Sequence, residues 1–529
     1  LRLGVNAGNS IASGGNYNTV VGDEAGTAIT TGDYNVAVGY DALTVDTLGG
    51  NSVAIGAFAL RDQNFTSATN AYNVGVGYEA GGSVTTGVNN TLIGGLAGDA
   101  ITTGNNNSVV GYSALGANTT GASNAAFGLL SLAANTTASF NSGFGQNSLA
   151  ANTTGANNSA VGFGALAANT TASNNTAVGH SALLANTTGT QNVSVGAFAL
   201  DANTTANDNT GVGYGALSAN TTGASNTALS NALGGNTTGA SNTGLGHFAL
   251  ANNTTANANT AVGKSALFAN TTGTSNVALG YEAMLTNTTA DNNTAVGLRA
   301  LKLNTTGASN VALGTSALEA NTTASNNTAV GHLSLGANTT GTSNTAIGGS
   351  AGAALTTGSY NVIAGHRAGD ALDTGGNNVA IGWAALTLDT KGDKSTAVGR
   401  SALASQNFTS ATDSYNVAMG YLAGGAVTTG VQNTLIGGLA GDAITTSDYT
   451  VAVGYNAAGS STTGHSNSVL GRQALFNNTT GSQNVAVGRD ALEANTTASN
   501  NTAVGFHALV ANTTGTDNTA VGSASLDAN

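Results

Sequence analysis

The chain has 529 residues and a formal net charge of −13, and only 7% of its residues are charged. Its 11 basic residues form no cluster, which argues against nucleic-acid binding. Cysteine is absent, which excludes disulfide and thiol chemistry, and no apolar run is long enough to span a membrane. No targeting segment is recognised either.

A unit of seventeen residues repeats along almost the whole sequence. Its clearest copy runs from Asn304 to Ala320, and its positions are numbered 1 to 17 from Asn304. Position 11 is glycine in twenty-nine of the thirty successive copies from Gly22 to Gly522, and the exception is Ser230. A short fixed period indicates a repeat architecture, and seventeen residues suit one coil of a β-solenoid.

Positions 7 to 11 form the strand that we expect in each coil. They read Asn, then Thr or Val, then Ala, then Val, Leu or Ile, and then Gly, so positions 8 and 10 share one face. Glycine at position 11 suits a tight bend with positive φ. A second short strand around positions 14 to 17 or 1 to 3 would close the coil. Each coil then buries only about three sizeable side chains. Such a thin core favours an assembly in which several chains share one core.

Positions 15 and 1 exchange the large side chain between them. Most copies have Leu at position 15 and Asn at position 1. A minority have Gly at 15 and an apolar residue at 1, as in Gly98 with Ile101. We infer that the two positions fill the same core volume. The copy with Ala458 and Ser461 has neither large residue, so we expect that coil to be loosely packed.

We interpret residues 1–529 as one continuous solenoid domain with four sub-blocks. Residues 1–112 are varied, 113–347 are regular, 348–466 are a varied copy, and 467–529 are regular again. In the regular part Asn-Thr-Thr-Gly alternates with Asn-Thr-Thr-Ala, so a pair of coils is predicted as the true unit. Both ends fall inside the repeat although solenoids need caps, so we expect a fragment of a longer chain with its anchor and tip domains elsewhere.

Two copies carry four additional residues. The glycine spacing widens to twenty-one between Gly56 and Gly77 and again between Gly399 and Gly420. Each insertion contains the same segment, Gln-Asn-Phe-Thr-Ser-Ala-Thr, with Phe65 in one copy and Phe408 in the other. Inserted residues in a solenoid form a loop on one side, and loops often bind partners. Phe65 and Phe408 are therefore candidate contact residues, and the alternative is a tolerated bulge inherited by duplication.

The segments Asn51-Ser-Val-Ala-Ile-Gly56 and Asn377-Asn-Val-Ala-Ile-Gly382 resemble the head repeats of trimeric autotransporter adhesins, the YadA-like family. The resemblance implies a left-handed parallel β-roll, packed side by side as a homotrimer, that binds host proteins or other surfaces. The repeats are also similar to those of phage and virus tail fibres. The family's usual repeat is a few residues shorter than seventeen, and its neck, stalk and membrane anchor are not found in this sequence.

Position 12 is the most variable column beside the fixed glycine, which indicates an outward edge. Its aromatic and basic side chains are the kinds favoured at interfaces. This column could be a seam between protomers or a stripe that contacts a ligand. The candidate contact residues are Tyr40, Tyr78, Tyr112, Tyr214, Tyr281, Trp383, Arg400 and Tyr421.

The Asn-Thr-Thr segment has three possible interpretations. Stacked Asn and Thr side chains can form hydrogen-bonded ladders along a solenoid. Asn-x-Thr is also an N-glycosylation acceptor where the host permits it, and a flat array of Thr could bind ice. The candidate glycosylation residues are Asn118, Asn135, Asn152, Asn169, Asn186 and Asn203.

No residue pattern indicates catalysis, a cofactor or a metal site. The histidines of position 12 lie several coils apart, and the acidic residues lack the density of a calcium loop. We therefore expect an all-β parallel solenoid of about thirty coils, acting as a non-catalytic extracellular or virion-borne fibre with a cell-surface protein or glycan as partner. A monomeric ice- or glycan-binding solenoid and a subunit of a structural filament remain the alternatives.

Overall fold

The computed structural model describes residues 1–528, which form no helix. They make a parallel β-solenoid of about 31 turns, with successive turns roughly 17 residues apart. The fold class expected from the repeat is therefore confirmed. The chain divides into two compact units, Leu1–Asn259 and Thr260–Asn529, which are described separately.

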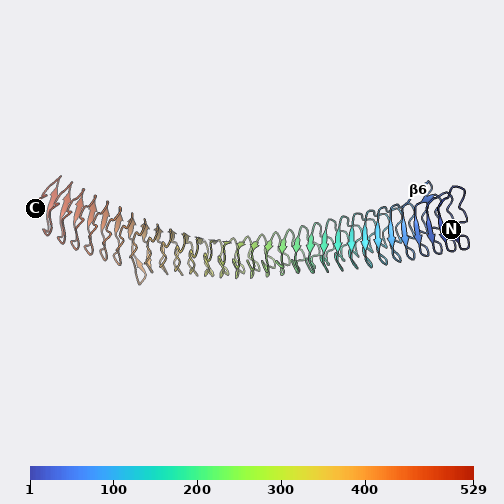
Figure 1. Ribbon diagram of the computed structural model, residues 1–529. Helices are drawn as coiled ribbons and strands as arrows, with labels where there is room; N and C mark the ends of the chain where they lie inside the picture. The colour runs from blue at the N-terminus through green and yellow to red at the C-terminus, as the bar shows by residue number, and fades with distance from the viewer. Residues whose placement is uncertain (529) are drawn as a thin grey trace. The chain divides into compact units, whose positions relative to one another are not determined.

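Each turn of the first unit contributes one short strand to a parallel ladder (Figure 1). Successive strands pair in register, as in Thr176↔Val193. Two further strands, β4 and β6, pair only with each other. The strands are β1 (Arg2–Leu3), β2 (Thr19–Val21), β3 (Val36–Val38), β4 (Gly49–Gly50), β5 (Val53–Ile55), β6 (Thr69–Asn70), β7 (Val74–Val76), β8 (Thr91–Ile93), β9 (Ser108–Val110), β10 (Ala125–Phe127), β11 (Ser142–Phe144), β12 (Ser159–Val161), β13 (Thr176–Val178), β14 (Val193–Val195), β15 (Thr210–Val212), β16 (Thr227–Leu229) and β17 (Thr243–Leu245).

The second unit is built in the same way. Its strands pair in register as well, as in Val311↔Thr328, and β26 pairs only with β28. The strands are β18 (Thr260–Val262), β19 (Val277–Leu279), β20 (Thr294–Val296), β21 (Val311–Leu313), β22 (Thr328–Val330), β23 (Thr345–Ile347), β24 (Val362–Ala364), β25 (Val379–Ile381), β26 (Gly392–Asp393), β27 (Thr396–Val398), β28 (Thr412–Asp413), β29 (Val417–Met419), β30 (Thr434–Ile436), β31 (Val451–Val453), β32 (Ser468–Leu470), β33 (Val485–Val487), β34 (Thr502–Val504) and β35 (Thr519–Val521).

The middle residue of each main strand from β2 to β35 faces the interior, and its two neighbours face outward. In β21, Ala312 is fully buried, whereas Val311 and Leu313 are 39% and 46% exposed. Positions 8 and 10 do share a face, as predicted, but it is the outer face. Each coil buries about three sizeable side chains, as expected: in the clearest copy they are Asn304, Asn310 and Leu318, while the narrow coil leaves room at position 9 mainly for alanine. In the clearest copy the large apolar core residue is Leu318 at position 15.

Buried asparagine amides fill much of the remaining interior. At position 1, the Asn304 amide donates to Asn287 Oδ1 at 2.9 Å and to the Gly307 carbonyl at 2.9 Å. At position 7, the backbone N–H of Asn310 donates to Asn293 Oδ1 at 2.9 Å. Each of these two asparagines bridges neighbouring coils, so its buried polar groups are paired as burial requires. Asn338 Oδ1 is an exception, because position 1 of the next coil is Leu355. The predicted side-chain ladder is confirmed.

The rest of each coil consists of turns in place of the second strand that we expected. Three non-glycine residues per regular coil adopt left-handed backbone conformations, as Ser309, Ser316 and Leu318 do with φ of 58°, 55° and 51°. These residues interrupt the extended backbone that a strand needs, so that prediction is wrong for the regular coils. Backbone hydrogen bonds still join successive coils, as from Thr305 N–H to the Thr322 carbonyl at 2.8 Å.

The exchange between positions 15 and 1 is confirmed by the packing. A Cβ added to Gly98 would lie 2.7 Å from Cδ1 of Ile101 and 2.9 Å from Cδ2 of Leu92. Ile101 thus occupies the space that a leucine at position 15 would take. Leu92, at position 9, fills part of it too, which the sequence pattern of positions 15 and 1 did not reveal.

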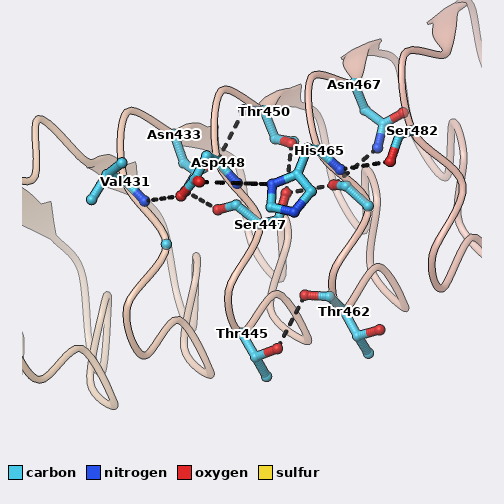
Figure 2. A network of polar contacts seen from close by, with 12 residues as sticks. Val431, Asn433, Thr445, Ser447, Asp448, Thr450, Thr462, His465, Asn467 and Ser482 are labelled. Carbon is cyan, nitrogen blue, oxygen red and sulfur yellow. Dashed lines mark hydrogen bonds and ion pairs between the residues drawn. The ribbon is translucent and has the colours of Figure 1, made fainter.

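A third ladder runs along position 5. In the second unit, Val431 N–H donates to Asp448 Oδ1 at 2.7 Å, Asp448 N–H to His465 Nδ1 at 2.9 Å, and His465 N–H to Ser482 Oγ at 3.0 Å (Figure 2). In the regular part the corresponding bond recurs at every second coil, as from Ala308 N–H to Ser325 Oγ. This bond gives the two-coil alternation seen in the sequence a physical reason.

Candidate binding surface

The side chains of position 12 project outward directly after the stacked glycines of position 11. Gly39 has a φ of 135°, and a Cβ on it would lie 2.6 Å from the carbonyl group of Gly56, so the backbones of successive coils touch there. The next side chain has no room inside and turns to solvent. All the position 12 candidates are exposed, as predicted: Tyr40, Tyr78, Tyr112, Tyr214, Tyr281, Trp383, Arg400 and Tyr421.

Three tyrosines of the first unit form one aromatic row, which we call the first row. Tyr40, Tyr78 and Tyr112 follow β3, β7 and β9, and are 49%, 54% and 57% exposed. Phe58 stands edge-on between two of them, with ring centroids 5.4 Å from Tyr40 and 5.9 Å from Tyr78 and interplanar angles of 89°. The ring of Tyr112 lies over Gly95, 3.5 Å from the place where a Cβ would sit.

The second unit carries the equivalent second row, which consists of Trp383, Tyr421 and Tyr455. Their side chains are 47%, 50% and 53% exposed. The Arg400 guanidinium lies 5.0 Å from the Trp383 ring centroid and 5.8 Å from that of Tyr421, so it occupies the place that Phe58 has in the first row. The ring of Tyr455 lies over Gly438, 3.6 Å from the place of a Cβ.

Tyr214 and Tyr281 belong to other surroundings. Tyr214 ends a chain of ring contacts through Phe198, at 6.0 Å, and His180, at 5.2 Å from Phe198. Tyr281 hydrogen-bonds Glu282, which raises the pKa of the Tyr281 hydroxyl. Lys302, 2.8 Å from Glu282, lowers the pKa of that carboxyl. These two tyrosines are exposed side chains of the same column that do not extend either row.

Sequence reasoning missed Phe58 and Tyr455. Phe58 is at position 13, whose residue type varies from glycine to arginine between copies, and its part in the row depends on contacts across coils. Tyr455 was left off the candidates although it occupies the same place in the second varied block as Tyr112 in the first. A comparison of the two copies, column by column, would have found Tyr455.

Phe65 and Phe408 are not surface residues, so their prediction as partner contacts is wrong. Each is only 5% exposed. The backbone N–H of Phe65 donates to Asp46 Oδ1 at 3.2 Å, and that of Phe408 donates to Asp389 Oδ1 at 3.2 Å. The insertion therefore folds its phenylalanine inward over a buried acid.

A buried polar network lies beneath each insertion. In the first unit, the Gln63 amide donates to Asp46 Oδ2 at 2.6 Å and to Ser52 Oγ at 2.9 Å, and Gly49 N–H donates to Asp46 Oδ1 at 3.0 Å. Burial raises the pKa of Asp46, although the hydrogen bond from Gln63 acts in the opposite direction. Asp46 therefore has the donors that a buried carboxylate requires.

A small hollow of about 180 Å³ opens beside the first insertion. Its walls combine hydroxyl, amide and carboxylate groups with small apolar ones, and Asp33 Oδ1 already accepts a hydrogen bond from Asn16 N–H. This hollow is therefore a minor feature of the insertion. It is lined by Thr31, Gly32, Asp33, Leu48, Gly50, Ala68, Thr69 and Asn70.

The candidate glycosylation residues are buried, so the prediction that they carry glycans in the folded chain is wrong. The Asn118 side-chain amide donates to the Gly121 carbonyl at 2.9 Å, and that of Asn135 donates to Asn118 Oδ1 at 3.0 Å. A glycan would need this same nitrogen and would not fit inside the coil. The fully buried set is Asn118, Asn135, Asn152, Asn169, Asn186 and Asn203.

The two threonines that follow each asparagine differ in their surroundings. Thr305, at position 2, is half-buried, and its hydroxyl donates to the Thr322 carbonyl at 3.0 Å. Thr306, at position 3, is exposed. Of these two columns, only position 3 therefore presents its threonines fully to solvent.

The outer face of the main strands is a second extended surface. From β2 to β35 its two columns, positions 8 and 10, hold no charged residue. Leu279, Leu313 and Ile347 at position 10 are 45%, 46% and 48% exposed. Position 8 is Thr or Ser in most coils, whereas position 10 is apolar in every coil from β2 to β35. The apolar stripe is therefore the position 10 column, and an exposed stripe of this kind marks an interaction surface.

Residues 1–528 include no group of three His, Asp or Glu side chains that could hold a metal ion. They also include no helix long and apolar enough to cross a membrane. No protein-family model and no curated protein matches this chain.

Proposed function

We propose that the chain is a non-catalytic adhesive or structural shaft in an extracellular fibre, borne on a cell or virion surface and assembled as a side-by-side homotrimer. The observation that carries the proposal is the apolar position 10 column on the uncharged outer face of the strands. A chain that worked alone would leave this uncharged stripe in water along both units, whereas packing against other copies would cover it.

The size of the stripe supports association between copies. The second unit alone has sixteen main strands, β18–β25, β27 and β29–β35, among its described residues. At about 4.8 Å per strand and about 10 Å of width, its outer face offers roughly 750 Å² to a partner. A standard protein–protein interface buries about 800 Å² on each side.

The position 12 column supports the adhesive part of the proposal. It presents tyrosine, tryptophan and arginine side chains that are about half exposed. These residue types carry much of the binding energy at interfaces. A cell-surface protein or glycan is the partner that this column would contact.

The experiment is a measurement of native mass by light scattering, followed by negative-stain imaging. We expect three times the chain mass and straight rods. The triple variant Leu279→Ser, Leu313→Ser and Ile347→Ser should weaken association, since it places three hydroxyls in the apolar position 10 column. The matched control, Thr306→Ala, Thr323→Ala and Thr340→Ala, changes three exposed residues of the position 3 column and should keep the mass.

A monomeric mass for the unmodified chain would overturn the trimer. Ice recrystallisation assays would then test the exposed threonine column as the surface of a monomeric ice-binding solenoid. End-to-end polymers of single chains would favour a filament subunit. Equal loss of mass in both triple variants would show that the strand face is not the contact.

A further inference from the structure

The aromatic residues of each row are spaced evenly. In the first row, Tyr40, Tyr78 and Tyr112 follow alternate strands, β3, β7 and β9, and these strands are linked through β5 and β8. Between the tyrosines, position 12 holds Ala57 and Gly95. Neighbouring parallel strands lie about 4.8 Å apart, so successive rings are spaced by about 9.6 Å.

The second row has the same spacing. Trp383, Tyr421 and Tyr455 follow β25, β29 and β31, which are linked through β27 and β30. Position 12 of the intervening coils holds Arg400 and Gly438. Two separate regions of the chain thus present three exposed aromatic rings in line at the same interval.

Neighbouring residues hold the rings in place in both rows. The last ring packs over the glycine that stands at position 12 of the preceding coil in both rows, Gly95 and Gly438, with the ring 3.5 Å and 3.6 Å from the place of a Cβ. A flat group separates the first two rings both times, as the ring of Phe58 or the guanidinium of Arg400. The rows are therefore ordered platforms, and not aromatic residues scattered singly over a surface.

We propose that each row binds an extended β-1,4-linked glycan chain, whose disaccharide repeat has nearly the length of two coils. The apolar C–H faces of pyranose rings stack on the negative faces of aromatic rings. A glycan that repeats every two sugars places an equivalent pyranose face over each ring of the row. This inference rests on the proposed adhesive function and names the ligand class of its position 12 column.

The two rows differ in charge, so we expect them to prefer different β-1,4-linked glycans. The coil between Tyr40 and Tyr78 has the neutral Ala57, whereas the coil between Trp383 and Tyr421 has Arg400. The N–H groups of a guanidinium donate charge-assisted hydrogen bonds to carboxylates. The first row suits neutral chains, and the second row suits chains whose sugars carry a carboxylate.

The test is isothermal titration of the full chain with three hexasaccharides. Chitohexaose is neutral, oligomannuronate is its carboxylated β-1,4-linked counterpart, and maltohexaose is a curved α-1,4-linked control. We expect chitohexaose and oligomannuronate to bind and maltohexaose to fail. Equal binding of maltohexaose, or no binding of either β-1,4-linked chain, would overturn the proposal.

Variants of the first row test the spacing directly. Tyr78→Ala should weaken chitohexaose binding by about fivefold or more, since one stacking contact contributes about 1 kcal/mol. The double variant Ala57→Tyr with Tyr78→Ala keeps three rings but moves the central one by a coil, so it should bind as weakly as Tyr78→Ala. Restored affinity would contradict the spacing argument. Tyr360→Ala, an exposed tyrosine outside the column, is the matched control.

The native mass of each variant separates this proposal from the proposed function. A trimeric rod that binds no glycan would overturn the glycan rows alone. A monomer that binds chitohexaose would overturn the trimer and leave the rows standing. Loss of trimer mass in Tyr78→Ala would identify position 12 as the seam between protomers and overturn the glycan rows.

Discussion

Two blocks of the chain, residues 36–112 in the first unit and 379–455 in the second, are built on the same interior. Asp46, Gln63 and Phe65 of the first block correspond to Asp389, Gln406 and Phe408 of the second. The bond from the glutamine amide to the aspartate is 2.6 Å long in both. The members of this buried network bond to one another across neighbouring coils, so a change to one member would leave others unpaired.

The interiors of the two blocks are alike, but their surfaces differ. Asn51 donates to Asn70 Oδ1 at 2.9 Å beside the first insertion, whereas Lys394 pairs with Asp413 at 2.6 Å beside the second. Phe58 separates two rings of the first row, and Arg400 does so in the second. Burial thus constrains the network, while exposed contacts tolerate a change of charge. The four predictions below start with the largest expected effect.

Removal of the buried acid should damage both blocks equally. Asp46→Ala leaves the amide of Gln63 and the N–H groups of Gly49 and Phe65 without their acceptor. Each buried donor left without an acceptor costs about 1–3 kcal/mol. Hydrogen exchange measured by mass spectrometry should show lost protection over residues 46–73.

The matched variant Asp389→Ala should expose residues 389–416 to the same extent, because its hydrogen bonds are the same. Glu319→Ala, in a half-buried position of a regular coil, serves as the control. Unchanged protection in either aspartate variant would show that the network does not hold the insertion.

Adding a large side chain at position 15 should destabilise the coils that have glycine there. Gly98→Leu drives a side chain into Ile101 and Leu92 and should cost about 1–3 kcal/mol of unfolding free energy. Adding Ile101→Asn should recover part of this loss, since leucine at position 15 with asparagine at position 1 is the combination found in the regular coils. Calorimetry checks both variants, and the equivalent pair Gly441→Leu with Ile444→Asn in the second block should behave alike. A neutral Gly98→Leu would contradict the shared core volume.

The groups between the rings should have smaller effects. Phe58→Ala removes two edge-to-face contacts and Arg400→Ala removes two cation–π contacts, each worth about 1 kcal/mol. Trp383 is the only tryptophan of the chain, so its fluorescence reports on the second row. Arg400→Ala should shift its emission, whereas Arg489→Ala, beside Phe506, should not. An unchanged spectrum in Arg400→Ala would contradict the contact.

The exposed ion pair of the second block should matter least for stability. The hydrogen bond from Lys394 lowers the pKa of Asp413, so the pair stabilises the fold above the ordinary range of an aspartate pKa. That contribution disappears as the pH falls through the lowered pKa. In Lys394→Ala, carbon-13 NMR titration should show the Asp413 pKa moving upward. The matched variant Asn51→Ala in the first block should introduce no such pH dependence, and an unmoved Asp413 pKa would contradict the pairing.

Much of the candidate binding surface could be predicted from the repeat. The predictions that failed did so for physical reasons. Exposure of Tyr78 and Trp383 followed from their column beside the stacked glycines. Phe65 was misplaced because an insertion has no periodic neighbour that shows which way its side chain turns. Asn118 was given a possible surface role because the motif Asn-Thr-Thr reads the same whether its amide faces solvent or the next coil.

The sequence by itself determined the repeat of seventeen residues, the parallel strand in each coil, the exchange between positions 15 and 1, and the outward column at position 12. A strict period dictates all of these, because every coil must meet a copy of itself. Only the tertiary structure decided that alanine faces inward while Leu313 and its equivalents face outward. Alternation along a strand separates its two faces, but only the closed path of the coil, through its left-handed turns, decides which face lies inside.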